Sequence, residues 1–358
     1  MDLFQTQSYH FDLPEELIAA YPLAKRSDSK LLVVHRQSGR IEHLMLRDLP
    51  VILPAHTLII ANNTKVFPAR LKGEREGTRG KMEFFLLKKI ESGVWQGLMK
   101  ATAKVHPGYR FVLHKDGKTI TAEVIERDQT TAGVFLTARF SEDPVDAGFG
   151  EVPLPPYIVA KRGESQASEL DTYNTVFAKE QGSVAAPTAG RHFTPELIQK
   201  LIDQGMDWAE ITLHVGMGTF KPVTTADVRE HQMHEEQSFV SSEVAMKLIK
   251  AKKAGHPVLA VGTTSTRTLE GRSRITAQGL QFEAGEKPID LFIHPESKHD
   301  WLMVDAMLTN FHLPESTLLM MVASFMGSLP RLLEIYKEAV QEKYRFYSYG
   351  DAMLILPD

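Results

Sequence analysis

The sequence of 358 residues contains no cysteine. Without thiols the chain has no disulfide framework, thiolate nucleophile, cysteine-ligated zinc site or iron–sulfur cluster. Two catalytic sequence patterns are also missing: the Gly-x-x-x-x-Gly-Lys-Ser/Thr phosphate loop and the Gly-x-Ser-x-Gly elbow of serine hydrolases. The sequence therefore gives no support to reactions that depend on these groups.

Long hydrophobic runs and a basic leader are absent as well. The longest apolar run, residues 317–327, is too short to cross a bilayer, which takes about 20 residues. The first residues carry Asp2, Asp12, Glu15 and Glu16 and no basic stretch, unlike a secretory signal. We therefore expect a cytoplasmic protein that does not associate with membranes.

Length and charge point to two domains with different surfaces. At roughly 100–200 residues per domain, the length indicates two domains. Residues 65–118 hold thirteen Lys or Arg against five Asp or Glu, a net charge of +8, whereas the whole chain is −4 and the remainder therefore −12. A basic block on an acidic chain is either a footprint for a polyanion such as RNA or a solvated strand surface.

Residues 71–140 have the pattern of a small antiparallel β-barrel. Short β-prone runs at 82–87, 94–99, 110–113, 119–124 and 134–138 are separated by glycine-containing turns. Asp116-Gly117 is the clearest hairpin turn, because glycine readily adopts the positive φ that such a turn requires.

The rest of the chain alternates strands and helices, which indicates an α/β domain. Thr194 is expected to cap a helix that begins at Pro195 and stops before Gly205. Further helices are expected at 242–254, 265–277, 314–326 and 330–343, and strands at 58–61, 209–215, 258–261, 290–293, 303–309 and 352–356. Because 58–61 belongs to this pattern, we expect a discontinuous α/β domain, residues 1–64 and 151–358, with the small β-barrel domain, residues 65–150, inserted into it.

Two hydroxyl-rich turns lie where α/β domains bind ligands, after a strand and before a helix. They are GSVAAPTAGRH at 182–192 and VGTTSTR at 261–267. Their backbone N–H groups and hydroxyls suit a carboxylate, phosphate or ribose. GMG at 216–218 lacks the third glycine of the dinucleotide-binding pattern. For each turn taken alone, a structural role is the competing interpretation, and Arg162 and Arg267 are either anion clamps or surface charges.

Several histidines lie in or next to turns between the expected strands and helices, and a histidine beside a glutamate is equipped to move protons near neutral pH. They include His192, His214, His231, His234 and His312. The segment HQMHE at 231–235 lacks the order of zinc proteases, and no third ligand is evident from the spacing, so we expect no metal.

Ten segments, in order over nearly the whole chain, resemble the S-adenosylmethionine:tRNA ribosyltransferase-isomerase family of queuosine biosynthesis. They are Tyr21-Pro22 with Arg26, NNTKVFPAR (62–70), GKME (80–83), GEVPLPPY (150–157), GSVAAPTAG (182–190), LHVGMGTF (213–220), HQMHE (231–235), AVGTTS (260–265), LTNFHLPEST (308–317) and YRFYSYGDAM (344–353).

The resemblance implies a monomer with a barrel-like α/β large domain and a small antiparallel β-barrel. It implies that the ribosyl group of S-adenosylmethionine is transferred to, and isomerised on, 7-aminomethyl-7-deazaguanine (preQ1) at the wobble position of tRNA. The products are epoxyqueuosine-tRNA, adenine and methionine. S-adenosylmethionine is consumed as a cosubstrate without a metal, which agrees with the absence of cysteine.

The reaction requires a base for the C5′ proton beside the sulfonium and a donor for the departing adenine. We assign proton transfer to His214 and to His234 with Glu235, and an orienting role to Asp351. We expect the cosubstrate pocket to be lined by Thr188, Thr263, Thr264, Ser265, Asn310 and His312. The candidates for RNA binding in the basic block are Lys65, Arg70, Lys81, Lys100 and Lys104.

Two departures from the family pattern stand out. Arg191 replaces a usual leucine beside His192, and residues 296–301 (ESKHDW) replace a Gly-aromatic continuation. These departures either alter RNA affinity or substrate preference, or they are surface changes that are compensated elsewhere in the protein. Two other functions remain open on the sequence alone, a protein that only binds structured RNA and a metal-dependent nucleoside hydrolase.

Overall fold

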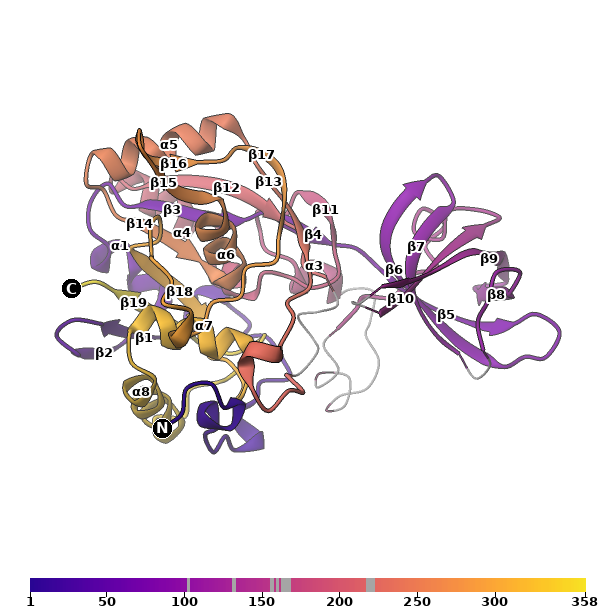
Figure 1. The fold of residues 1–358 in the computed structure, drawn as a ribbon, viewed down its shortest axis with the longest axis horizontal. Coiled ribbons are helices and arrows are strands. Elements are labelled where there is room, and N and C mark those ends of the chain that lie inside the picture. The colour runs from indigo at the N-terminus through magenta and orange to yellow at the C-terminus, as the bar shows by residue number, and fades with distance from the viewer. Residues whose placement is uncertain (102–103, 131–132, 155–157, 159–160, 162–168, 217–222) are drawn as a thin grey trace. The chain divides into compact units, whose positions relative to one another are not determined.

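The computed structural model describes residues 1–101, 104–130, 133–154, 158, 161, 169–216 and 223–358 (Figure 1). The chain divides into two compact units, each described here by itself. The larger unit comprises Met1–Thr64, Tyr173–Glu180 and Ala186–Asp358, and the smaller comprises Lys65–Thr172 and Gln181–Ala185. The expected inserted domain, residues 65–150, falls within the smaller unit.

The larger unit is built on a mixed sheet of nine strands in the order β17-β13-β12-β3-β14-β18-β19-β1-β2. Its central strands β12, β3, β14 and β18 are parallel neighbours, and β19 runs antiparallel to β18. The bounds are β1 Lys30–His35, β2 Ile41–Met45, β3 Leu58–Asn62, β12 Asp207–Leu213, β13 Glu236–Val240, β14 Val258–Val261, β17 Gly285–Ile289, β18 Ala306–Asn310 and β19 Ala352–Leu356.

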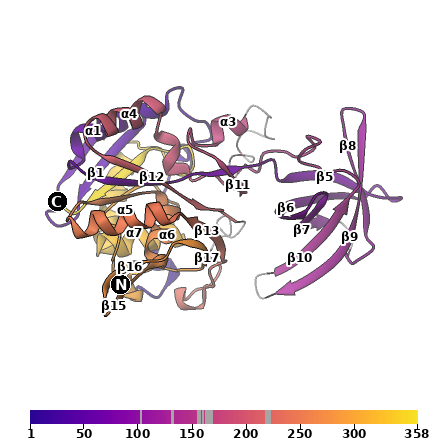
Figure 2. The same ribbon diagram turned by 90° about the horizontal axis from the view of Figure 1, so that it is seen from above.

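Helices cover both faces of this sheet, as Figure 2 shows. Strands β3, β14 and β18 are buried along their whole length, which explains their nearly continuous runs of apolar residues. One face packs against α1 (Leu49–Ile52) and α4 (Pro195–Asp203), together with the 3₁₀-helix η5 (Thr188–His192). The other packs against α5 (Ser242–Lys253), α6 (Gly262–Arg272), α7 (Thr317–Met326) and α8 (Leu329–Gln341).

The helix cap predicted at Thr194 is present, and Ser241 forms a second one. The hydroxyl oxygen of Thr194 accepts a hydrogen bond from the Leu197 N–H at 3.2 Å, and Ser241 does the same for Val244 at the start of α5. Each cap satisfies one of the backbone N–H groups that a helix start leaves without an intrahelical acceptor.

Two predicted elements are wrong in place. The strand expected at 290–293 lies earlier, at β17, where Pro288 is tolerated because β17 is an edge strand. The helix expected at 265–277 begins at Gly262, directly after β14, and ends at Arg272. The following residues form a hairpin of β15 (Ser273–Thr276) and β16 (Gly279–Phe282).

The smaller unit is a closed antiparallel barrel in the order β10-β7-β6-β5-β8-β9. Its strands are β5 Arg70–Arg75, β6 Lys81–Glu91, β7 Val94–Ala101, β8 Arg110–Lys115, β9 Lys118–Thr130 and β10 Gly133–Phe140. The interior is packed by alternate residues, including Phe84 and Phe111, whose rings stack 5.9 Å apart. Asp116 and Gly117 form the predicted β8–β9 turn, with φ of 47° and 77°. The fold class, an α/β domain with a small antiparallel β-barrel, is confirmed.

The remaining elements are short. They are α3 (Glu169–Tyr173), β4 (Thr64–Val66), β11 (Glu180–Ser183), and the 3₁₀-helices Thr6–Tyr9, Glu15–Leu17, Arg26–Asp28, Leu46–Asp48, Val228–Glu230 and Pro295–Ser297.

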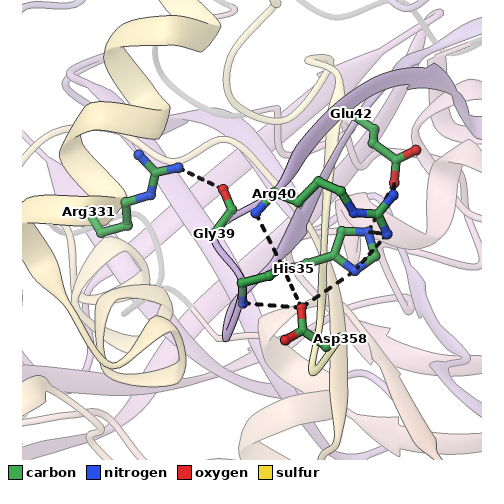
Figure 3. A network of polar contacts seen from close by, with 7 residues as sticks. His35, Gly39, Arg40, Glu42, Arg331 and Asp358 are labelled. Carbon is green, nitrogen blue, oxygen red and sulfur yellow. Dashed lines mark hydrogen bonds and ion pairs between the residues drawn. The ribbon is translucent and has the colours of Figure 1, made fainter.

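The C-terminal residue of the larger unit is fastened to the turn between β1 and β2 (Figure 3). The Asp358 carboxylate accepts a hydrogen bond from the Ser38 hydroxyl at 2.7 Å, and Arg331 of α8 donates to the Gly39 carbonyl at 2.9 Å. This network lies at the carboxyl ends of β1 and β19. Because β19 runs antiparallel to β18, this network lies at the opposite edge of the sheet from the carboxyl end of β18.

Candidate active site at a sheet edge

The carboxyl ends of the four parallel strands collect most of the predicted site residues. His214 follows β12, Thr263 follows β14, and Asn310 ends β18. Asp351 precedes β19, which is antiparallel to β18 and therefore begins at the same edge. Thr188 comes from η5, where the neighbouring Ala189 side chain packs beside Gly262. Residues far apart in the sequence are thus brought to one edge of one sheet, the usual place for a ligand in an α/β fold.

His214 is half-buried and held in a defined orientation. Its Nδ1 lies 2.8 Å from the hydroxyl oxygen of Thr64, and its backbone N–H donates to the Gln237 carbonyl at 2.8 Å. Burial lowers the pKa of His214, and the charge of Glu180 acts in the opposite direction. The imidazole is therefore neutral at pH 7 and suited to accept a proton.

Asn62, at the end of β3, ties the neighbouring strand ends together. Its amide nitrogen donates to the Leu213 carbonyl at 3.0 Å and to the Thr264 hydroxyl oxygen at 3.2 Å. Its amide oxygen accepts from the backbone N–H groups of Leu213 and Thr64. Sequence reasoning gave Asn62 no role, although its place directly after a buried strand was a signal for one.

The start of α6 supplies the predicted cosubstrate residues Thr263, Thr264 and Ser265. Gly262 has a φ of +85°, which lets the chain turn from β14 into the helix without a loop. Thr263 and Ser265 are buried, and no hydrogen-bond partner satisfies the Ser265 hydroxyl within the described residues. The helix start therefore presents backbone N–H groups and hydroxyls at the sheet edge.

Three other predicted residues are buried and engaged with the protein. His312 Nε2 lies 2.9 Å from the Thr309 hydroxyl oxygen, and burial lowers the pKa of this histidine to about 3. Asn310 donates to the Tyr347 carbonyl at 2.9 Å. The Asp351 carboxylate accepts from the backbone N–H groups of Lys30 and Arg345. As placed, these three side chains hold the strand ends in position.

His234 and Glu235 lie just before β13, and a neighbour makes the stronger contacts. Glu235 is exposed and accepts a hydrogen bond from Gln237, whereas Glu236 is buried and pairs with Arg267 of α6 at 2.6 Å. Arg267 is buried, so it is not a surface charge. The second oxygen of Glu236 accepts from the Gly216 N–H at 3.0 Å, which links the ion pair to the chain after His214.

Residues 217–220 of the predicted motif, Tyr157 and Arg162 lie outside the described residues.

A pocket of about 610 Å³ opens beside His214 within the larger unit. It runs along β12 and combines aromatic, acidic and basic side chains. Its lining residues are Asn63, Lys179, Glu180, Trp208, Ala209, Glu210, Ile211, Thr212, His214, Phe239, Ser241, Glu243, Val244, Lys247 and Glu286. The size suits a small ligand or a nucleobase. Apart from His214, none of these residues is a predicted site residue.

The two departures from the family pattern have structural partners. Arg191 is buried, donates to the Ser348 carbonyl at 3.0 Å and lies over the Tyr349 ring at 4.2 Å. In the second departure, His299 Nε2 lies 3.2 Å from the carboxylate of Glu270 in α6.

Glu270 is a fully buried carboxylate. It binds the main chain of the segment that directly follows residues 296–301. Its two oxygens accept hydrogen bonds from the backbone N–H groups of Leu302, Met303 and Val304, at 2.8–3.1 Å.

Predicted RNA-binding residues lie in the smaller unit. Register pairs Glu74 with Lys81 and Glu83 with Lys100, so Lys81 and Lys100 share the face of the barrel opposite to its packed interior. Lys65, Lys81, Lys100 and Lys104 are exposed. Arg70 instead forms an ion pair with Glu83, which makes it less free to meet a phosphate.

Metal-binding clusters and single membrane-spanning helices are both absent from the residues that the structure describes. Within these ranges, no group of three or more His, Asp or Glu could hold a metal ion. No described helix is by itself long and apolar enough to span a membrane. The pair α7 and α8, bent by 112°, satisfies length and composition together, but their apolar side chains belong largely to the core of the larger unit.

Known proteins resemble this chain over nearly its whole length. A sequence profile described as "Queuosine biosynthesis protein" matches residues 6–355. An S-adenosylmethionine:tRNA ribosyltransferase-isomerase of Desulfitobacterium hafniense is 42% identical over 98% of this chain and 99% of its own. One of Clostridioides difficile is 43% identical over the same shares. The crystal structure of an S-adenosylmethionine tRNA ribosyltransferase from Thermotoga maritima matches 98% of this chain and all of its own, with 34% identity and a TM-score of 0.54.

Polar side chains gather at the carboxyl ends of the parallel strands, the edge where α/β proteins usually bind ligands, and a separate β-barrel completes a two-unit fold. The comparisons with known proteins point to a single enzyme family within this fold class. The chain belongs to the S-adenosylmethionine:tRNA ribosyltransferase-isomerase family of queuosine biosynthesis, and the predicted family is confirmed.

Proposed function

We propose that this chain transfers the ribosyl group of S-adenosylmethionine to 7-aminomethyl-7-deazaguanine at the wobble position of tRNA and isomerises it. The products are epoxyqueuosine-tRNA, adenine and methionine, and no metal takes part. The whole-length match to the family is the observation that carries the proposal. The enzyme is proposed to act in the cytoplasm, as a monomer.

His214 is the proposed base for the C5′ proton. The adjacent sulfonium raises the acidity of this proton, and the imidazole must be neutral because only then does a ring nitrogen have a free lone pair to accept it. Burial supplies such a group by lowering the pKa of His214, and Thr64 fixes the ring through Nδ1. Among the described residues no hydrogen bond occupies Nε2, so this nitrogen is the one proposed to face the substrate. His234 with Glu235 is the second candidate for proton transfer.

The start of α6 and the end of β18 are proposed to hold the cosubstrate. Thr263, Thr264 and Ser265 present hydroxyls beside backbone N–H groups, a combination that suits ribose hydroxyls and a carboxylate. Thr188 contributes from η5. Asn310 and His312 support this edge from β18, and Asp351 fixes the start of β19 beside them.

The proposal is tested by measuring adenine release from S-adenosylmethionine. We expect release only when the tRNA carries the aminomethylated base, and no loss of activity in a chelator. Release that does not need this tRNA would overturn the proposed transfer. Release that stops in a chelator and returns with a divalent metal would favour the nucleoside hydrolase. A chain that binds the tRNA but releases no adenine would be the RNA-binding protein.

A further inference from the structure

We propose that the pocket beside His214 receives the aminomethylated base of the tRNA, with Phe239 as the surface on which it stacks. Glu210 and Glu286 are proposed to recognise its hydrogen-bond donors. This inference rests on the proposed function and adds where the acceptor base lies and what selects it.

The pocket wall is set by the alternation of β12. Trp208, Glu210 and Thr212 share one face of the strand, and His214 continues the alternation beyond its end. The residues between them, at 209, 211 and 213, are buried in the core of the sheet, and Ala209 and Ile211 also border the pocket. A ligand that lies along this face therefore reaches His214, the candidate general base, at one end.

Across the strands, the same wall continues through an aromatic ring to a carboxylate. Thr212 of β12 is the register partner of Phe239 in β13, and Phe239 is the register partner of Glu286 in β17. Directly paired residues place their side chains on the same face. Phe239 is nevertheless 46% exposed, because its ring borders the pocket and does not pack into the core. An exposed aromatic ring in a pocket of this size is suited to stack a nucleobase that has turned out of the tRNA stack while still attached to the tRNA.

Carboxylates dominate the charge of the lining. Glu180, Glu210, Glu243 and Glu286 stand against Lys179 and Lys247, and Lys247 is already paired with Glu243 at 3.0 Å. Carboxylates only accept hydrogen bonds. The aminomethylated deazaguanine offers donors on two edges, the ammonium of its side chain and its N1–H with the 2-amino group. The lining is thus complementary to this base, and it would disfavour a free phosphate or carboxylate.

Glu210 is held in place before any ligand arrives. One carboxylate oxygen accepts from the Trp208 indole N–H at 3.2 Å and the other from the Asn63 amide at 3.4 Å. Asn63 in turn accepts from the Thr212 hydroxyl at 2.8 Å. A fixed acceptor gives up less conformational entropy on binding, so Glu210 is built for recognition.

The first experiment measures binding of the free base to the full-length protein by calorimetry. We expect 7-aminomethyl-7-deazaguanine to bind at least about tenfold more tightly than 7-deazaguanine, which lacks the ammonium. The double variant Glu210→Gln, Glu286→Gln should narrow this preference at least about threefold. Glu334→Gln, an exposed glutamate of α8, is the matched control and should keep it. Equal binding of the two bases by the wild type, or an unchanged preference in the double variant, would overturn the assignment.

The second experiment tests Phe239. Phe239→Ala should weaken binding of both bases about tenfold or more, because it removes base–aromatic stacking, whereas Phe239→Tyr should keep it. Ile275→Ala, which truncates another exposed apolar residue, is the control. With tRNA, Phe239→Ala should raise the KM for tRNA and leave the KM for S-adenosylmethionine unchanged. Binding by Phe239→Ala equal to wild type would refute the stacking role. Adenine release by the wild type is a separate measurement, so failure of the proposed function is distinguished from failure of this pocket.

Discussion

Nη1 of Arg267 lies 2.6 Å from Oε2 of Glu236, and both side chains are only 4% exposed. The other Glu236 oxygen accepts the Gly216 N–H, two residues after His214. Arg267 is anchored further by the carbonyls of Leu291 and Ile289. A buried ion pair thus connects α6, which begins at the proposed cosubstrate residues, to the chain that carries the proposed base.

Glu236→Gln should destabilise the protein strongly. It leaves the Arg267 guanidinium buried without its counter-charge, and removing one partner of a buried pair costs about 3–5 kcal/mol. Urea unfolding at pH 7 measures the change. Glu283→Gln, which breaks a partly exposed pair with Lys287, is the control and should change the free energy of unfolding by less than about 1 kcal/mol. Similar small effects of both substitutions would contradict the importance of the buried pair.

His214→Ala should lower the single-turnover rate at least about tenfold while S-adenosylmethionine still binds, because general base catalysis contributes about 10²–10⁴-fold. His234→Ala is expected to do the same if that residue shares the proton transfer. His10→Ala, which removes an exposed histidine, is the comparison. An unchanged rate in either variant would remove that histidine from the mechanism.

Stability should fall as the pH drops below about 6.5. His192 and His312 are buried, and burial lowers the pKa of each to about 3. Between pH 6.5 and 3 the unfolded chain therefore binds more protons than the folded one, and each histidine takes away about 1.4 kcal/mol per pH unit as the pH falls. Urea unfolding at pH 6.5, 6 and 5 should show a shallower pH dependence in His312→Gln. A slope equal to wild type would mean that His312 is protonated in the folded state.

Binding of tRNA should weaken with salt if the barrel meets the phosphates. Lys81→Glu with Lys100→Glu should lower affinity and reduce the slope of log affinity against log salt by about 0.7–0.9 for each phosphate that the protein no longer neutralises. Lys337→Glu on α8 alters charge in the larger unit and serves as the control. A salt-independent affinity would refute the RNA-binding assignment of this face.

We also propose that residues 65–150 fold on their own. The barrel has its own packed interior and all six strands within this range. A fragment extended to residue 154 should unfold at a higher temperature, because the backbones of Arg70 and Glu151 exchange hydrogen bonds at 3.2 and 2.8 Å. Circular dichroism of both fragments is the measurement. A disordered 65–150 fragment with a folded extended one would move the domain boundary.

Local pattern was enough to predict much of the fold. The buried strand at 258–261 and the capped helix after Thr194 are decided by their own residues, and both are confirmed. The 290–293 strand was misplaced because Pro288 reads locally as a break, and only the sheet order reveals that β17 is an edge strand. Likewise, α6 begins at Gly262, directly after β14, because this glycine turns the chain with a positive φ. Helix propensity alone does not indicate a helix start at a glycine.

The site was predictable where a polar residue follows a strand. The threonines after residues 258–261 were singled out in this way, whereas His214 was expected inside the strand 209–215 and follows β12 only in the structure. The contacts of Asn62 and the roles proposed for Glu210 and Phe239 were missed, because they depend on register across strands and not on spacing along the chain. Glu235 was chosen because it closes the motif HQMHE at 231–235, whereas Glu236 directly follows the motif and is distinguished only by its burial.

The Glu270 carboxylate has a consequence for the segment that departs from the family pattern. Its main-chain partners Leu302, Met303 and Val304 donate N–H groups that almost any amino acid would supply. The path of the main chain after the loop is therefore fixed by Glu270 of α6, which is distant from the loop in sequence. Substitutions within residues 296–301 leave these three main-chain bonds in place, whereas replacing Glu270 removes all three at once.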